Sequence, residues 1–313
     1  MTFRYGVYGL SIEADAPIDG ALAAAIPNEP DLRIFLHSMP PSAAALYATP
    51  PVFDDQNVTI FLDGGAYGFL YADGTRFAID RSASTIWSAA PPSATLADTA
   101  TYLLGPVLAF VLRRRGTLSL HASAVVVAEQ AVAIAAAPGG GKSTTAAAFA
   151  DRGAAVVTDD VLPIVWRGGE PYAEPGYPRL RLWPETVAAR YGANDALPLL
   201  SPGWTKRYLD VGARFPRAPL PLGAIVVLRE RVAGAPRMAR LGGHEAAMQL
   251  VANSSMALYL DAAMRVEELD RVTALVERVP LFAAWPSDDL ARVGELCDMV
   301  TAAVASGALS SPR

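Results

Sequence analysis

Apolar and polar positions alternate with a period of two through much of the first hundred residues, which is typical of strands. Asp63-Gly64-Gly65 and Asp73-Gly74 interrupt the alternation as turn signals, and the second predicts a hairpin because Asp-Gly tolerates positive φ. The Pro- and Ala-rich stretches 39–51 and 89–94 are typical of loops. This part of the chain therefore predicts a β-rich unit, with strands in Phe3–Ile12, Val58–Leu62, Tyr67–Ala72 and Phe77–Asp80.

The stretch Thr99–Leu112 is the most apolar in the chain and is followed by Arg113-Arg114-Arg115. A bilayer-spanning helix needs about 20 residues, and this stretch is shorter and interrupted by Gly105-Pro106. We predict a buried core helix and no membrane association. The domain boundary is expected at Arg113–Gly116, which gives a β-rich domain over 1–115 and a second domain over 116–313.

From Leu118 the pattern changes to buried strands separated by a Gly-rich turn and a helix. Ser119–Val127 and Ala131–Ala135 predict strands, Thr144–Arg152 a helix, and Ala154–Val157 a strand that leads into Asp159-Asp160. Strand, turn, helix and strand in this order predict a βαβ unit and an α/β fold. Further elements are expected at Ala224–Leu228 (strand), at Gly243–Leu260, Ala262–Val279 and Asp288–Ser306 (helices), and as a frayed tail at 307–313.

Composition narrows the class of protein. The chain has 313 residues, of which 52% are hydrophobic and 18% charged, with a net charge of −5, so disorder is excluded and nothing indicates nucleic-acid binding. Cys297, His37, His121 and His244 are too scattered for a zinc cluster, and one cysteine excludes an internal disulfide. The N-terminus lacks the pattern of a signal peptide. We expect a cytoplasmic protein.

The segment Ala136-Ala137-Pro138-Gly139-Gly140-Gly141-Lys142-Ser143 fits the P-loop pattern except that Ala136 replaces its first glycine. Glycines let backbone N–H groups approach phosphates, and the helix that follows adds its positive N-terminal end. Lys142 would reach the β/γ-phosphates and Ser143 would hold Mg²⁺. Only two lysines occur in the chain, and Lys142 is one of them. We assign nucleotide binding to Pro138, Gly139, Gly140, Gly141, Lys142, Ser143 and Thr144.

Asp159 and Asp160 close the strand after the P-loop helix, so both are expected at the sheet edge where phosphates lie. One carboxylate would hold Mg²⁺, and the other would accept the proton of an attacking hydroxyl. A helix or turn cap is the structural alternative. If its strand neighbours the P-loop strand, His121 would lie near the γ-phosphate and pair with Asp159; otherwise it is a core histidine.

Arg181 and Lys206 are further candidates for binding a phosphate or a peptide carboxylate. Arg179 and Arg181 share one strand face, which is equally consistent with a solvated surface. Trp183 and Trp204 are expected to be packing residues, and Cys297, His37 and His244 structural ones.

The combination LHASAVVV, a P-loop ending in GKST, and RGAAVVTDDV resembles the catalytic domain of HPr kinase/phosphorylase. It resembles still more the HPr-kinase-like proteins encoded beside lasso-peptide genes, which phosphorylate the precursor peptide. YGLSIEADAPI, YADGTRFAID, PGYPRLRLWPE and GWTKRYLD resemble that group too, so the similarity runs over most of the chain and is most specific in residues 118–165.

The resemblance implies an HPr-kinase-like P-loop domain with ATP and Mg²⁺ as cofactors and a peptide serine as acceptor. It implies that His121, Lys142 and Asp159 are catalytic, with Asp159 the base, and that Ser143 and Asp160 lie on the metal side. Thr144 stands where HPr kinases carry an acidic residue, which argues against HPr as substrate and against phosphorylase activity. HPr kinases form hexamers, but this chain offers no basis for assigning it that state, and a homo-oligomer is kept open.

Three functions are therefore weighed. The first is a serine kinase acting on a peptide, with a lasso precursor as the acceptor that the resemblance implies. The second is a kinase for a small metabolite. The third is a nucleotide-binding regulatory protein without transfer activity, which the Ala136 departure favours.

Overall fold

The computed structural model describes residues 1–257 and 262–306. Two compact units are present: Met1–Arg115 with Leu200–Thr205, and Gly116–Leu199 with Lys206–Arg313. The predicted helix Gly243–Leu260 is shorter in the structure, where it ends at Ala252; residues 258–260 of that prediction and the predicted frayed tail 307–313 lie outside the described residues.

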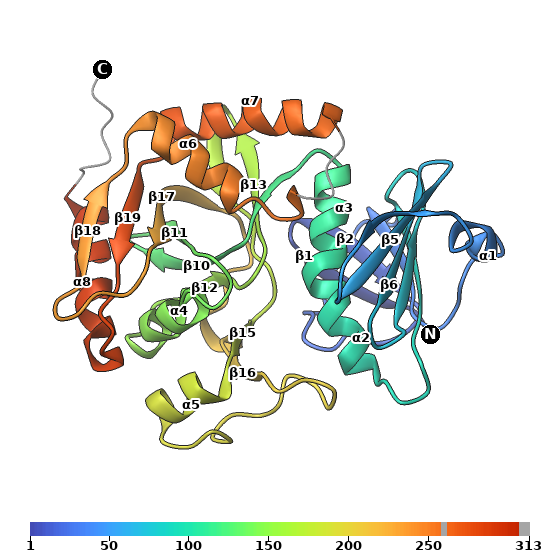
Figure 1. The fold of residues 1–313 in the computed structure, drawn as a ribbon, viewed down its shortest axis with the longest axis horizontal. Coiled ribbons are helices and arrows are strands. Elements are labelled where there is room, and N and C mark those ends of the chain that lie inside the picture. The colour runs from blue at the N-terminus through green and yellow to red at the C-terminus, as the bar shows by residue number, and fades with distance from the viewer. Residues whose placement is uncertain (258–261, 307–313) are drawn as a thin grey trace. The chain divides into compact units, whose positions relative to one another are not determined.

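The first unit is built on an eight-stranded sheet, confirming a β-rich N-terminal region (Figure 1). The predicted strand Phe3–Ile12 is instead a hairpin, because Tyr8 (φ 59°) and Gly9 (φ 76°) turn the chain between two strands. The sheet order is β1-β2-β3-β8-β7-β6-β5-β4. The strands are β1 (Phe3–Val7), β2 (Leu10–Ala14), β3 (Leu32–Phe35), β4 (Pro51–Asp54), β5 (Val58–Asp63), β6 (Ala66–Tyr71), β7 (Arg76–Ile79) and β8 (Thr85–Ala89).

A long apolar helical segment covers this sheet. It comprises α2 (Leu96–Tyr102), η1 (Leu103–Val107) and α3 (Leu108–Arg114), and Phe110 packs edge-on against the rings of Tyr67 and Phe69 at 4.7 and 5.1 Å. The π-helical turn η1 contains the Gly-Pro pair, where the proline has no N–H to donate. By length and composition Leu96–Arg114 qualifies as a membrane span, yet 78% of its most apolar window is buried. It is a core helix.

The short segment Leu200–Thr205 belongs to the first unit although its chain neighbours belong to the second. Asp98 anchors it: this buried carboxylate accepts hydrogen bonds from Ser201 Oγ (2.6 Å) and Gly203 N (2.8 Å). The same side chain closes a capping box with Thr95 at the start of α2. Within the predicted loop 39–51 the structure forms one short helix, α1 (Ala43–Leu46), which packs against β5 and β6.

The second unit is a three-layer α/β structure (Figure 1). Helices α4 (Lys142–Asp151) and α8 (Val293–Ala305) cover one sheet face, and α6 (Gly243–Ala252) and α7 (Ala262–Arg278) cover the other. The predicted C-terminal helix starts later than Asp288, because a 3-10 turn, η4 (Leu290–Arg292), precedes α8. The strands are β9 (Leu118–Leu120), β10 (Ala122–Val127), β11 (Gln130–Ala135), β12 (Val156–Thr158), β13 (Leu162–Arg167), β14 (Glu170–Ala173), β17 (Leu220–Leu228), β18 (Arg237–Arg240) and β19 (Leu281–Trp285).

Strand β10 is inserted between the two strands of the predicted βαβ unit. It pairs antiparallel with both β11 and β12, so these two run parallel to each other but are not adjacent. On its other side β11 pairs parallel with β17, and β17 with β19. The ends of β11 and β12 and the start of β10 therefore lie at one edge of the sheet, where the P-loop begins.

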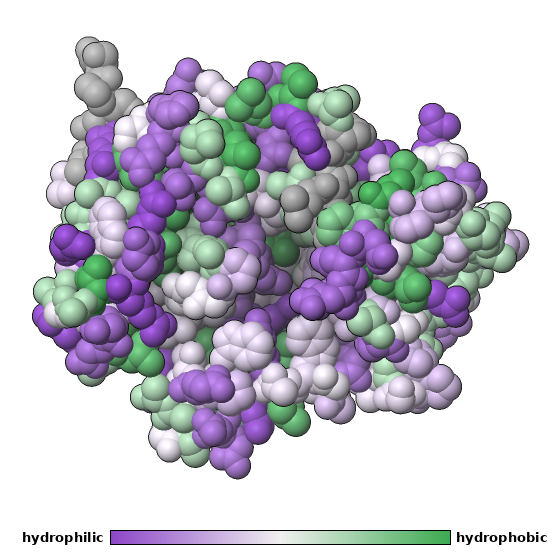
Figure 2. Space-filling view, in the orientation of Figure 1, coloured by the Kyte–Doolittle hydropathy of each residue, from purple (hydrophilic) through white to green (hydrophobic). Residues whose placement is uncertain are grey.

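The surface of the helical layer α6–α7 carries exposed apolar side chains. Figure 2 shows hydrophobic residues among polar ones over these two helices. Met248 and Val251 on α6 and Val266 and Leu269 on α7 are between 40% and 64% exposed. The predicted helices at Gly243 and Ala262 are thus present, each amphipathic, with their opposite faces buried against the sheet.

Candidate active site

The P-loop is shaped by glycines with distinct tasks. Gly139 (φ 76°) and Gly141 (φ 99°) adopt left-handed conformations that favour glycine. At Gly140 an added Cβ would lie 2.8 Å from the Cβ of Ala136 and 2.9 Å from the carbonyl oxygen of Ala137. Ala136 itself is not among the positive-φ residues. Alanine at the first P-loop position therefore costs no backbone strain, since the methyl group fits beside a glycine.

Lys142 begins α4 and is held at the loop by its side chain. Its Nζ donates a hydrogen bond to Ala136 O at 2.9 Å, and the residue is only 7% exposed. Burial lowers the pKa of Lys142, and the negative charges of Asp160 and Asp159 oppose this shift. The structure thus holds the Lys142 side chain beside the glycines of the loop.

Asp159 lies behind the P-loop serine. It is 1% exposed, and its Oδ1 accepts hydrogen bonds from Ser143 Oγ at 2.9 Å and Ser123 Oγ at 2.5 Å. Its Oδ2 accepts one from the backbone N–H of Arg181 at 2.8 Å. P-loop NTPases hold Mg²⁺ with a loop serine or threonine and an aspartate, and Ser143 and Asp159 are residues of these types in direct contact.

Asp160, unlike its neighbour, faces the open cleft. Its Oδ1 lies 3.2 Å from His121 Nδ1, and its Oδ2 lies 3.4 Å from an Arg181 guanidinium nitrogen. Burial by itself raises the pKa of Asp160, but the hydrogen bond from His121 and the charge of Arg181 outweigh it and hold this pKa well below its usual range. Its backbone has φ 74°, a strained conformation for an aspartate, which turns the side chain back toward the histidine.

The position of His121 follows from a break between two strands. Its N–H donates to Asn253 O at 2.7 Å, while β9 before it pairs with β13 and β10 after it pairs with β11 and β12. The side chain consequently emerges at the sheet edge instead of in the core. The expected pairing of His121 with Asp159 is corrected: its partner is Asp160, through both the carboxylate and the backbone oxygen at 3.0 Å.

A two-stranded hairpin forms the opposite wall. Strands β15 (Arg179–Leu182) and β16 (Arg207–Asp210) pair with Leu182 opposite Arg207, so Trp183 and Lys206 meet just beyond the register. The Lys206 ammonium lies 4.7 Å from the centroid of the Trp183 ring. Trp183 is 48% exposed, which corrects its expected role as a packing residue. The hairpin brings Arg181 and Lys206, far apart in sequence, to one cleft.

Most of the predicted site residues converge on this cleft. It is lined by His121, Pro138, Gly139, Gly141, Lys142, Ser143, Thr144, Asp160, Arg181 and Lys206, together with Leu182, Trp183, Thr186 and Arg231. Gly140 and Asp159, the latter 1% exposed, do not line it.

Sequence reasoning overlooked Ser123 and Arg231. Ser123 was detectable, because it lies two residues after His121 in the predicted strand Ser119–Val127, in which alternate residues share a face. Arg231 follows the predicted strand Ala224–Leu228, and because β17 runs parallel to the P-loop strand, Arg231 lies at the same sheet edge.

The oxygen ligands that Ser143 and Asp159 could offer to a metal fit Mg²⁺ better than they fit a structural metal ion. Within residues 1–257 and 262–306 no group of three or more His, Cys, Asp or Glu side chains is arranged to hold a metal. Mg²⁺ is usually bound by one or two protein oxygens together with substrate phosphates. The converging oxygens of Ser143 and Asp159 match that requirement.

Comparison with known proteins gives little sequence similarity. No family model matches the chain. No curated protein matches it. Among solved structures, the chain is similar to the HPr(Ser) kinase/phosphatase from Coxiella burnetii, at 14% sequence identity and a TM-score of 0.31, over 61% of this chain and 96% of that one.

Proposed function

We propose that the protein is a kinase that uses ATP and Mg²⁺ to phosphorylate a serine hydroxyl of a peptide. One observation carries the proposal: Lys142 and Ser143 of the P-loop line the same cleft as Asp160 and His121. Asp160 and His121 contact each other and come from outside the P-loop. A nucleotide-binding site alone would need only the first half of this arrangement. A transfer site needs both a phosphate cradle and a group facing the acceptor.

The chemistry divides between the two aspartates. The acceptor oxygen attacks the γ-phosphorus, the bond from that phosphorus to the β,γ-bridging oxygen breaks, and ADP leaves with the electron pair. Asp160 accepts the hydroxyl proton, and His121 and Arg181 hold its carboxylate in place. Lys142 neutralises charge on the phosphate oxygens. We thus assign the base role expected of Asp159 to Asp160, because Asp159 is buried against Ser143.

Ser143 and Asp159 would hold the metal ion. When bound there, Mg²⁺ supplies positive charge to the β- and γ-phosphate oxygens. Ser123 and the backbone N–H of Arg181 orient Asp159 for this task through their hydrogen bonds to it. The expected metal-side role of Asp160 passes to Asp159 in this proposal.

The acceptor wall supports a peptide as the substrate. Trp183 presents an exposed ring, and the Lys206 ammonium beside it offers a charge for a carboxylate or phosphate. An exposed aromatic ring and a cationic group on an open wall offer more contact surface than a small acid needs, and a peptide could use both groups. The resemblance to the lasso-cluster kinases supports a lasso precursor as the peptide.

The third hypothesis, a nucleotide-binding regulatory protein without transfer activity, is no longer supported by the sequence feature that favoured it. It rested on Ala136, and alanine at that position has ordinary φ and fits against Gly140. A small-metabolite kinase remains the second enzyme hypothesis.

The test is mass spectrometry of peptides encoded by short reading frames beside the gene, incubated with protein, ATP and Mg²⁺. We expect a gain of phosphate on serine. Asp160→Asn should lower transfer by about 10²–10⁴-fold, or ~3–5 kcal/mol of barrier, and leave ATP affinity within about threefold. Asp159→Asn should instead weaken Mg²⁺-dependent nucleotide binding.

The opposite pattern would return the base role to Asp159: full transfer with Asp160→Asn, and loss with Asp159→Asn at unchanged binding of the nucleotide and metal. ATP binding without transfer to any peptide would favour the metabolite kinase.

A further inference from the structure

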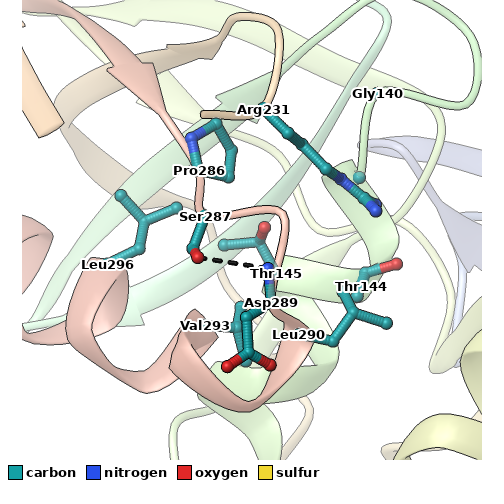
Figure 3. A pocket seen from close by; sticks show the side chains of 11 residues that line it. Gly140, Thr144, Thr145, Arg231, Pro286, Ser287, Asp289, Leu290, Val293 and Leu296 are labelled. Carbon is teal, nitrogen blue, oxygen red and sulfur yellow. Dashed lines mark hydrogen bonds between the residues drawn. The ribbon is translucent and has the colours of Figure 1, made fainter. Parts of the chain in front are cut away.

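Two cavities outside the cleft differ greatly in size. The pocket in Figure 3, between the P-loop and the segment that joins β19 to α8, has a volume of about 20 Å³, which is room for about one water molecule. The other has a volume of about 230 Å³, which is enough for a small organic molecule. Its lining residues come from the starts of β11, β14 and β17, from the end of α7 and from the residue before β19.

The larger cavity lies where the sheet divides. On one side of β17, the pairing with β14 extends to Pro221, and the pairing with β19 begins at Ile225. Two strands thus share one side of β17, and the cavity lies at the junction between them. Strand β11 runs from Gln130 at this cavity to Ala135 before the P-loop, and a strand of six residues is about 20 Å long. The cavity is therefore separate from the cleft.

A β-bulge places an amide group in the wall of the cavity. Ala131 pairs with Leu222 and Val132 pairs with Ala224, so Gly223 is the extra residue of the bulge. A Cβ at Gly223 would lie 2.0 Å from Gln130 Oε1, so glycine leaves room for the Gln130 side chain. Within the described part of the chain, this Oε1 is buried without a hydrogen-bond partner, which costs about 1–3 kcal/mol. A ligand that brings an N–H donor to the Gln130 amide would offset that cost.

Two opposite charges line the cavity. The Arg278 guanidinium at the end of α7 lies 5.6 Å from the centroid of the Trp166 ring. Stacking uses the face of the guanidinium and leaves its N–H edge for a carboxylate. Glu170 at the start of β14 is exposed, and among the residues that the structure describes it forms no ion pair. Its carboxylate is therefore available to an ammonium group.

The remaining walls are largely apolar and stiff. Pro171, Pro221 and Pro280 line the cavity together with Leu222. The ring of each proline fixes its backbone φ, so these walls lose little freedom when a ligand binds. A cavity with one cation, one anion and apolar walls fits a small zwitterion, whereas a nucleotide or another polyanion would meet the charge of Glu170.

We propose that this cavity binds a free α-amino acid, with its carboxylate on Arg278, its ammonium on Glu170 and its side chain against the prolines and Leu222. The site lies at the opposite end of β11 from the P-loop and shares no residue with the cleft. It is thus a second ligand site, and its existence does not depend on the reaction proposed for the cleft.

The test measures the melting temperature of the full chain with each of the twenty free amino acids at millimolar concentration, followed by calorimetric titration of those that raise it. We expect at least one amino acid to raise the melting temperature by binding the folded state. Its N-acetyl derivative and its carboxamide should each bind at least about tenfold more weakly, because each lacks one of the two charges.

Variants of the lining residues test the same contacts from the side of the protein. Arg278→Gln and Glu170→Gln should each weaken binding of that amino acid at least about tenfold. Both positions are exposed, so the unliganded variants should melt within about 2 °C of the wild type. Arg237→Gln is the matched control, since Arg237 stacks on Trp285 at the same 5.6 Å outside the cavity. This control and Lys206→Ala, which removes a cation from the cleft, should bind the amino acid as the wild type does.

Several results would overturn the proposal. The first is that none of the twenty amino acids binds, and the second is that Arg278→Gln and Glu170→Gln bind as the wild type does. Loss of binding in Lys206→Ala would place the amino acid in the cleft, and equal binding of the derivatives would show that the charges are not recognised. These results concern the cavity alone, so none of them bears on the phosphorylation of a peptide at the cleft.

Discussion

Each unit of the molecule buries a charged side chain, and the two side chains differ in how fully their hydrogen bonds are satisfied. In the first unit Asp98 accepts four hydrogen bonds, from Thr95 N, Thr95 Oγ1, Ser201 Oγ and Gly203 N. These donors occupy both carboxylate oxygens. In the second unit Lys142 directs one hydrogen bond to Ala136 O in the described structure, although an ammonium has three donors.

The difference separates structural from functional burial of charge. Donors from the same unit compensate the desolvation of Asp98, so its burial fastens α2 to the segment Leu200–Thr205. The charges of the second unit meet at an open cleft, and part of their hydrogen-bonding capacity is directed there. The comparison predicts that removing a charge lowers stability in one unit and activity in the other.

The largest expected effect comes from Lys142→Met. Transfer and ATP binding should be lost, with transfer falling at least about 10³-fold or ~4 kcal/mol, because no other group on the loop supplies a positive charge to the phosphates from that position. Stability should not fall and should rise, since a buried ammonium of lowered pKa costs free energy at neutral pH. Chemical denaturation and nucleotide calorimetry check the two halves.

The sign of the Lys142 effect can be tested by pH. With its folded pKa below 10.5, the folded state releases the proton first, so wild-type stability rises between the folded pKa and 10.5. The advantage of Lys142→Met should shrink over that range. If Lys142→Met is less stable than the wild type at neutral pH, the contrast between the two units fails, because Lys142 would then stabilise the fold as Asp98 does.

A smaller effect, on stability alone, is expected from Asp98→Ala. Loss of the cap and of the hydrogen bonds to Ser201 and Gly203 should lower the free energy of unfolding by about 2–4 kcal/mol. Burial raises the pKa of Asp98, but these hydrogen bonds outweigh it and lower the pKa below 3.8. The Asp98 contribution is thus present above pH 3.8 and lost as pH falls through the folded pKa.

Urea unfolding at neutral and acidic pH measures this loss. The difference between wild type and Asp98→Ala should narrow as the solution becomes acidic. Asp54, an exposed aspartate at the end of β4, is a suitable control as Asp54→Ala, with an expected change within about 0.5 kcal/mol. A gap between wild type and Asp98→Ala that stays constant to pH 2 would exclude the carboxylate as its source.

The smallest effect is expected from Ala136→Gly, which restores the P-loop consensus. Because Ala136 has an ordinary φ, glycine relieves no strain, and the loss of a buried methyl group should cost about 1 kcal/mol. ATP affinity, measured by calorimetry, should stay within about twofold. A tenfold gain in affinity would show that the alanine restrains the loop, and would restore the sequence argument for a nucleotide-binding protein without transfer.

Much of the fold was predictable because local signals carry it. The P-loop, the helix after it and the strand leading to Asp159 follow from glycine spacing and apolar runs, and all three are present. The stretch Thr99–Leu112 was predicted as a core helix and lies within the observed helical segment Leu96–Arg114, where the predicted interruption at Gly105-Pro106 coincides with the π-helical turn. The Phe3–Ile12 strand was wrong at a single point, where Tyr8 adopts positive φ that no local pattern indicated.

The division of labour at the site was less predictable. Asp159 and Asp160 are adjacent in sequence, yet one turns inward to Ser143 and the other outward to His121. That choice depends on the backbone of Asp160 at φ 74° and on the insertion of β10 between β11 and β12. Both are set by strand pairing, which joins residues remote in the sequence.

The amino-acid sequence alone predicts the phosphate loop, because glycines followed by a lysine and a serine form a phosphate-binding geometry within a few residues. Only the tertiary structure decided what surrounds that phosphate. The β15–β16 pairing brings Lys206 to Trp183, and the hydrogen bond from Val232 N–H to Pro286 O joins the segments that follow β17 and β19. The physical reason is the sequence separation of the interactions. The conformation of a loop depends on its own residues, whereas a cleft depends on which strands, distant in sequence, pair with one another.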